Sequence, residues 1–242
     1  KTVEAFKTMK GNVDAMFFNA GVADCETLNN LLSAKYEANK EDVANLKEVA
    51  SLLRRSECVD LPLYATVAEQ LYQLDPTADA AYSLAIMFLK RQEFDKTEGY
   101  LKEAIAKSED NEAKAEYYLK MAQLQLAKKQ YQATKTNALE VLKLNPNNGT
   151  ALMLIGKAYA NSASNYGEDD FDHASVFWAA VDKFQKAKQV DPAMTEEADK
   201  LIGIYSQHFP SKDEAFFRSV TDGATVKIGS WINESTKARF RK

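Results

Sequence analysis

Few side chains in this sequence have the types and spacing that catalysis requires. Its two histidines, His173 and His208, lie in separate segments with no shared spacing, and histidines of that kind are usually structural or solvated. The sequence contains neither a glycine-rich phosphate loop nor a Gly-x-Ser-x-Gly nucleophile elbow. We therefore predict no catalytic residues, no cofactor and no enzymatic activity.

An acidic segment around residues 162–172 is the strongest candidate for a metal site. Glu168, Asp169, Asp170 and Asp172 place several carboxylates in a short stretch, and oxygen-rich loops bind calcium. The segment lacks the closing bidentate glutamate of an EF-hand, because an apolar helical pattern follows it. We expect Asp169 or Asp170 to cap that helix instead, so no metal site is predicted. A metal-dependent enzyme that uses this insertion is the less favoured alternative.

The chain has two cysteines, Cys25 and Cys58, which are too few for a disulfide framework or a cysteine-only zinc site. They lie about one helical hairpin apart, each near a turn. A bridge between them is geometrically feasible if their Cα atoms come within ~7 Å. Free buried thiols are the alternative, and the sequence leaves both open.

The elements that must position these residues are helices. Apolar residues recur at i, i+3, i+4 and i+7 through most of the chain, which predicts amphipathic helices. Sustained strand-like alternation is absent until about the last twenty residues. All five prolines fall where helices should begin or end, and three share a local form: Asp75-Pro76, Asn145-Pro146 and Asp191-Pro192.

One stretch, from Gly149 to Pro192, shows how two such helices would pack. In order, it contains Ile155-Gly156-x-x-Tyr159, then Ala180-x-x-x-Phe184, then Pro192. The two small residues let antiparallel helices approach closely, and the two aromatic residues fill the space beside that contact. The order resembles the tetratricopeptide repeat (TPR) signature, with Leu152 in place of its tryptophan. The resemblance implies an all-α, right-handed solenoid of antiparallel helix pairs, each packing on its neighbours.

The other proline-bounded segments predict about five such repeats followed by a short cap. Residues 1–10 are expected to be the end of a preceding helix, and residues 11–208 the TPR array. The predicted repeats are about 11–41, 42–77, 78–111, 115–148 and 149–194, with an extra helix at 195–208. Residues 209–242 form the predicted C-terminal cap, which would hide the last apolar face of the array.

A helical segment in the last repeat, Val176 to Val181, is apolar almost all round. A helix of that kind is buried on several sides. Trp178 could anchor a ligand, but we favour the interpretation that the cap covers it. Residues from Ala224 to Trp231 alternate in an extended pattern, and we expect them to meet this helix.

The first helices of the repeats should line a concave groove. The residues that the alignment places there are Tyr82, Ile86, Lys90, Glu116, Lys120, Gln123, Met153 and Lys157. This mixture of aromatic, aliphatic, amide and charged side chains suits a peptide or protein partner, although exposed charges often form a merely solvated face. The carboxylate-clamp co-chaperones resemble this fold but use Lys and Asn at set positions. This chain instead has Val49, Leu53, Tyr82, Ile86, Leu119 and Gln123, which disfavours binding of a chaperone tail.

The bulk composition excludes other partners. The net charge of the 242 residues is −4, which leaves no broad basic surface for nucleic acid or anionic lipid. No run approaches the ~18 apolar residues needed to span a membrane. The sequence opens at Lys1 without a signal-like start, and we expect that a signal peptide has been removed.

Three segments resemble a more specific group, the uncharacterised exported TPR proteins of Gram-negative anaerobic bacteria. They are Cys25 to Asp42, the run Val176-Phe-Trp-Ala-Ala-Val to Pro192, and the ending Phe209-Pro-x-Lys-x-Glu-x-Phe-Phe with Ile228-Gly-Ser-Trp-Ile. Where that group has a cysteine near the end, this chain has Ser230. The resemblance implies a periplasmic location in the cell envelope. We therefore predict a non-enzymatic protein-binding scaffold of the envelope; a cytoplasmic adaptor or assembly chaperone with the same groove is the alternative.

Overall fold

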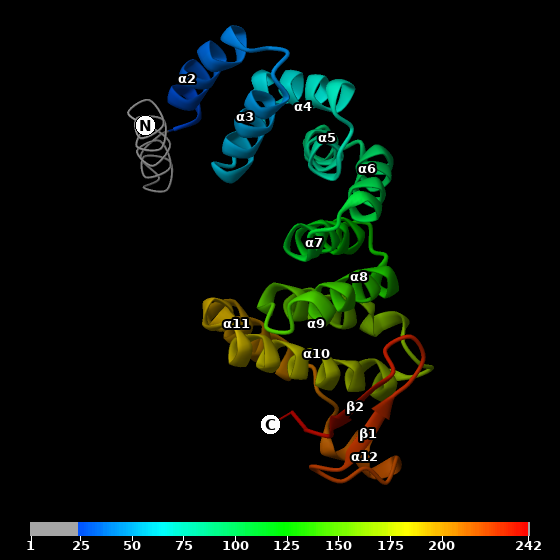
Figure 1. The fold of residues 1–242 in the computed structure, drawn as a ribbon. Helices are drawn as coiled ribbons and strands as arrows, with labels where there is room; N and C mark the ends of the chain where they lie inside the picture. Colours follow the sequence, from blue (N-terminus) through cyan, green and yellow to red (C-terminus); the bar gives the residue numbers. More distant parts are fainter. Residues whose placement is uncertain (1–23, 242) are drawn as a thin grey trace. The chain divides into compact units, whose positions relative to one another are not determined.

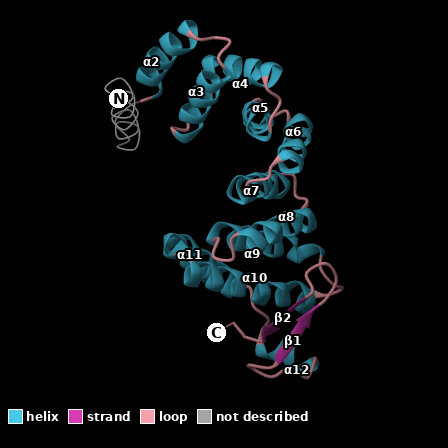
Figure 2. Cartoon of the chain, viewed as in Figure 1, coloured by secondary structure: helices cyan, strands magenta, loops and turns pink. Residues whose placement is uncertain are grey.

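The computed structural model describes residues 24–241. The helix end predicted at residues 1–10, and the first helix of the first predicted repeat, lie outside the described residues. The chain divides into two compact units, Lys1–Ser108 and Glu109–Lys242. Helices dominate the described part of each unit (Figures 1 and 2).

The described part of the first unit consists of consecutive antiparallel helices. They are α2 (Cys25–Ala38), α3 (Val43–Arg55), α4 (Pro62–Leu74), α5 (Ala78–Lys90) and α6 (Phe94–Lys107). Each helix packs against the next one along the chain, and alternate helices also touch, α2 with α4 and α3 with α5. The first helices of successive hairpins therefore form one row and the second helices another.

Short polar and proline signals set where these helices begin and end. The Asp42 carboxylate accepts a hydrogen bond from the backbone N–H of Ala44, 2.9 Å away, which caps α3. Pro62 occupies the first turn of α4, where its missing N–H leaves no helical bond unmade. Glu57 and Gln92 follow α3 and α5 with φ of 58° and 59°. This left-handed conformation turns the chain toward the next helix.

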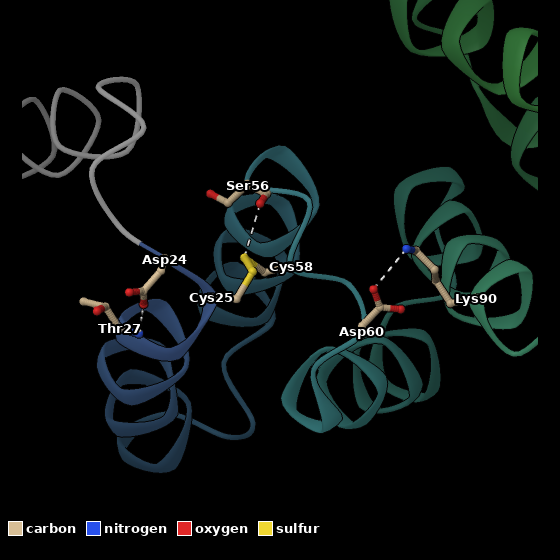
Figure 3. The surroundings of a disulfide bond; sticks show 7 residues. All are labelled: Asp24, Cys25, Thr27, Ser56, Cys58, Asp60 and Lys90. Atoms are coloured by element: carbon tan, nitrogen blue, oxygen red, sulfur yellow. Dashed lines mark hydrogen bonds and ion pairs between the residues drawn. A yellow bond between two sulfur atoms is a disulfide. The ribbon is translucent and has the colours of Figure 1, made fainter.

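A disulfide joins Cys25, the first residue of α2, to Cys58 in the loop between α3 and α4 (Figure 3). The two Cα atoms lie 5.4 Å apart. Of the two alternatives that the sequence left open, the structure contains the bridge, and residues 24–241 include no free cysteine. Cys58 is buried whereas Cys25 is exposed. The bond fastens the start of α2 to the following hairpin.

The second unit continues the helical pairs and ends in a small sheet. Its elements are α7 (Asn111–Ala127), α8 (Tyr131–Leu144), α9 (Gly149–Ser162), the 3-10 turn η1 (Ala163–Asn165), α10 (Asp170–Val190), the 3-10 turn η2 (Pro192–Met194), α11 (Thr195–Ser206), α12 (Lys212–Phe217), β1 (Thr225–Ile228) and β2 (Glu234–Lys237). Helices α7 to α11 pack successively, and α7 also contacts α9.

The close helix crossing predicted at Gly156 is confirmed. A Cβ added to Gly156 would lie 2.5 Å from Cε1 of Phe184, so α9 and α10 approach each other through the missing side chain. Gly149, at the start of α9, makes a second contact of this kind, because its Cβ would lie 2.5 Å from Cβ of Asp191. The two glycines fix the spacing of the α9–α10 pair at the first residue of α9 and at its middle.

The C-terminal segment forms an antiparallel hairpin, in which Val226 pairs with Thr236 and Ile228 with Glu234. Both strands contact α10, and Figure 1 shows the hairpin beside the start of that helix. The extended pattern predicted from Ala224 onward is therefore confirmed for β1.

The hairpin segment covers Trp178, as predicted. The indole is fully buried, and its Nε1 donates a hydrogen bond of 2.5 Å to the backbone carbonyl of Arg239. The rings of Phe171 and Phe240 meet it edge-on, with centroids 5.9 and 6.4 Å away. Trp231 lies against Tyr159 at 5.6 Å. Trp178 is therefore a core residue of the α10–hairpin junction and has no surface for a ligand.

Candidate functional site

The first helices of the pairs are α3 and α5 in one unit and α7, α9 and α11 in the other, and the predicted groove residues lie on α5, α7 and α9. Tyr82, Ile86 and Met153 are buried, each less than a tenth exposed. Their side chains supply packing between helices rather than contact surface. The exposed or half-buried members of the predicted set are Lys90, Glu116, Lys120, Gln123 and Lys157.

In the first unit, Arg54 at the end of α3 organises a polar cluster against α5. Its guanidinium lies 2.7 Å from the Asp79 carboxylate and donates a 2.6 Å hydrogen bond to Ser83 Oγ. It also lies over the Tyr82 ring, 5.2 Å from the centroid. Burial lowers the pKa of Arg54, but the charge and hydrogen bond of Asp79 together with the nearby Tyr64 and Tyr82 outweigh it, so the net shift is upward. The cluster fixes the spacing of α3 and α5.

Tyr64 of α4 closes this cluster from inside the unit. Its hydroxyl donates a hydrogen bond of 3.1 Å to the Ser83 backbone carbonyl, and the side chain is fully buried. Burial raises the pKa of Tyr64 to about 12, because an anion in this apolar setting would lose its hydration. The phenol therefore acts as a neutral hydrogen-bond donor.

Sequence analysis missed Arg54, Asp79 and Ser83. One signal was available for Ser83, which is the one small polar residue among the aliphatic and aromatic residues of the run Ala80–Met87 in α5. A polar group inside a buried helical stretch requires a partner, and the neighbouring first helix is the nearest place for one. The partner's identity, Arg54 rather than Arg55, depends on the rotation of α3 and was not available from spacing alone.

Two of the predicted groove lysines are held in ion pairs. Lys90 Nζ lies 3.0 Å from the Asp60 carboxylate in the α3–α4 loop (Figure 3). Lys157 Nζ, on α9, lies 2.6 Å from Glu197 on α11. Exposed pairs of this kind contribute little to stability. They place one pair of opposite charges beside α5 and another between α9 and α11.

The remaining candidates lie together on α7. Glu116, Lys120 and Gln123 follow one another at i, i+4 and i+7, so they share one face of that helix. Because α7 packs beside α9, Lys157 belongs to the neighbouring helix of the same row. This α7–α9 face (Glu116, Lys120, Gln123 and Lys157) is the predicted groove segment that keeps accessible polar side chains.

A shallow second surface lies in the first unit, between α2 and α4. This cleft of about 540 Å³ includes Glu26, Tyr36 and Glu37 from α2, Leu61 just before α4, and Thr66 from α4. It lies on the second-helix row and was not identified from the sequence. Its two carboxylates give it an acidic rim.

The acidic insertion has a structural role in the described chain. Asp169 accepts a hydrogen bond from the Asp172 backbone N–H, 2.9 Å away, and so caps α10 as predicted. Asp169 also pairs with Arg218. The backbone N–H of Asp172 holds the pKa of Asp169 below its usual value; burial opposes this shift, and the Arg218 guanidinium adds to it. Within residues 24–241, no cluster of acidic, histidine or cysteine side chains could hold a metal ion.

A buried polar cluster fastens the hairpin to the helices. The Tyr159 hydroxyl donates to Glu234 on β2 at 2.9 Å, and Lys183 of α10 pairs with the same carboxylate at 2.8 Å. Lys135 of α8 donates to the Ile232 carbonyl at 2.6 Å. Burial, followed by the charge of Glu234, raises the pKa of Tyr159 well above its usual value. These groups hold the cap in place and none faces an open pocket.

No protein-family model and no curated protein sequence matches the chain. Solved structures with a similar fold include YrrB and MamA. YrrB, described as a TPR protein with an unusual peptide-binding site, is 17% identical to this chain with a TM-score of 0.50, and the match covers 72% of this chain and 81% of the YrrB chain. MamA is 18% identical, also with a TM-score of 0.50, covering 79% of this chain and 90% of its own.

At these identities the similarity concerns the fold alone. Together with the successive helix pairs and the glycine contact between α9 and α10, it establishes the predicted all-α tetratricopeptide solenoid. Every helix among residues 24–241 is too short or too polar to cross a bilayer.

Proposed function

We propose that this protein is a non-enzymatic scaffold that binds a peptide or another protein along the first-helix row of its solenoid. The observation that carries the proposal is the α7–α9 face, where Glu116, Lys120, Gln123 and Lys157 keep accessible polar side chains on a packed support. Such a surface can pair with a peptide backbone and its charged side chains. The peptide-binding site described for YrrB, which has a similar fold, adds support.

We further propose an extracytoplasmic location in the cell envelope. The Cys25–Cys58 bridge supports it, because disulfides persist in oxidising compartments and are rare in a reducing cytosol. Acid quenching of the producing cells, followed by alkylation with a mass-tagged maleimide, measures the thiol state in vivo. Unmodified cysteines before reduction are the expected result; two tagged thiols would favour the cytoplasmic adaptor instead.

Binding is tested with the intact chain and matched charge variants. Immobilised wild-type protein should retain a partner from an envelope extract, and Lys120→Glu on α7 should reduce that retention. Lys186→Glu, at an exposed position of the second helix α10, makes the same charge change off the first-helix row and should leave retention unchanged. Equal effects of the two variants would contradict the proposed site.

A further inference from the structure

The short helix α12 presents an aromatic pair to solvent. Phe216 and Phe217 are 78% and 85% exposed, whereas the next most exposed large apolar side chain of the described residues, Leu31, is 54% exposed. Single exposed apolar residues are common on protein surfaces. Two adjacent phenylalanines with nearly full exposure form an apolar patch of a different kind.

The surrounding structure holds these rings outward. Ser211 and Glu214 form a reciprocal capping box at the start of α12, and Ala215 is buried on the inner side of the helix. The two rings meet edge-on with centroids 5.9 Å apart. The outward orientation is therefore built into a capped and anchored helix.

Charge is distributed unevenly between this region and the rest of the chain. Residues 209–242 contain seven Lys and Arg against four Asp and Glu, a net charge of +3, whereas residues 1–208 carry −7. Arg218, Arg239 and Arg241 of this segment pair with Asp169, Asp182 and Glu214. The exposed lysines Lys212, Lys227 and Lys237 therefore supply the charge that can face a bilayer, and they outnumber the exposed carboxylates Asp213 and Asp222.

We propose that the cap is a peripheral membrane-binding surface, with Phe216 and Phe217 inserting between the headgroups of an anionic bilayer. Apolar rings that enter the interface beside lysines that face lipid phosphates are the chemistry of monotopic attachment. The patch projects from a helix and does not line a groove. A bilayer accepts such a projection without a complementary shape, whereas a protein partner would require one. This surface is separate from the α7–α9 face.

Vesicle co-sedimentation of the full chain tests the proposal. The wild type should sediment with vesicles of phosphatidylcholine mixed with phosphatidylglycerol, and much less with phosphatidylcholine alone. The double variant Phe216→Ser/Phe217→Ser should lose about tenfold or more in binding. Leu31→Ser, at an exposed apolar position of α2, should bind like the wild type. Because Phe216, Phe217 and Leu31 are all exposed, the variants should fold like the wild type. Thermal melts of each variant check that they do.

A second readout locates the inserted residue. In Phe217→Trp, brominated lipid should quench the added indole, while the two tryptophans of the wild type, the fully buried Trp178 and the half-buried Trp231, should respond far less. Absence of binding to the anionic vesicles, or equal binding by the Phe216→Ser/Phe217→Ser variant, would overturn the proposal. Self-association in sedimentation equilibrium that this variant abolishes, without vesicle binding, would overturn it too and assign the patch to a second copy of the chain.

Discussion

Removal of the Cys25–Cys58 bridge should loosen α2 selectively. Thirty-three residues separate the two cysteines along the chain, and closing a loop of that size stabilises the folded state by about 4 kcal/mol in the chain-entropy model. Without the bridge, α2 is held by the buried side chains Leu28, Leu32 and Tyr36 and by the 2.6 Å hydrogen bond from Tyr36 to Gln70. The helix should therefore remain folded but open far more often.

Hydrogen exchange followed by mass spectrometry measures that opening helix by helix. A loss of about 4 kcal/mol corresponds to nearly a thousandfold faster exchange where opening of α2 limits the rate. The variant Cys25→Ser/Cys58→Ala and the wild type after reduction should agree, since both lack the bond. Amides of α9 and α10 serve as the internal control, because solenoid repeats stabilise mainly their neighbours.

Two results would refute this reasoning. Exchange of α2 that changes by less than about tenfold would mean that packing and the Tyr36 contact already account for nearly all of its stability. An equal acceleration in α9 and α10 would mean that the bridge acts on the whole chain rather than on the α2 end.

Three further predictions concern single contacts. Gly156→Ala should lower the free energy of unfolding by roughly 1–3 kcal/mol, because the added methyl group overpacks the helix contact. Gly203→Ala should raise the free energy of unfolding by up to about 1 kcal/mol, because a Cβ there meets nothing within 4 Å and alanine favours the helix. Chemical denaturation of the two variants measures both changes. The pKa of Tyr64 is raised by burial to about 12, so the contribution of this phenol to the unfolding free energy should be constant below pH 10 and fall by about 3 kcal/mol between pH 10 and 12. Because the pKa values of Tyr72 and Tyr159 are also raised, the wild type should lose more than this, and Tyr64→Phe should reduce the loss by that amount in urea titrations at each pH. Truncation after Val220 should uncover Trp178 and lower the free energy of unfolding by at least about 2–3 kcal/mol. The indole emission should shift to the red, and the protein should bind more of an apolar dye. Emission and dye binding like those of the full chain would contradict the covering role of the hairpin.

The helical pairs could be predicted because their causes are local. Proline positions, capping residues such as Asp42, and the Gly156–Phe184 contact follow from residue type and spacing. The cover over Trp178 was also predictable, because an all-apolar helix surface and an apolar C-terminal segment each need a partner.

The polar contacts between helices were less accessible. Whether Arg54 or Arg55 reaches Ser83 depends on a helix rotation of about 100°. The burial of Tyr82, Ile86 and Met153 could not be predicted for the same reason. Alignment to a repeat gives the position of a residue in its helix, but it does not show how much of the side chain a neighbouring helix covers. The disulfide could not be decided either, because two cysteines at suitable spacing fit both a bridge and free thiols.

The hairpin against α10 also limits how this array can change in length. A repeat protein grows by duplication of a unit whose exposed face accepts the next copy. Here α11, β1 and β2 all pack against α10, the second helix of the last complete pair, and exposed Lys227 and Lys237 discourage pairing of a further strand. Gain or loss of repeats in related chains should therefore occur upstream of α9, with the segment from α9 to the hairpin inherited as one block.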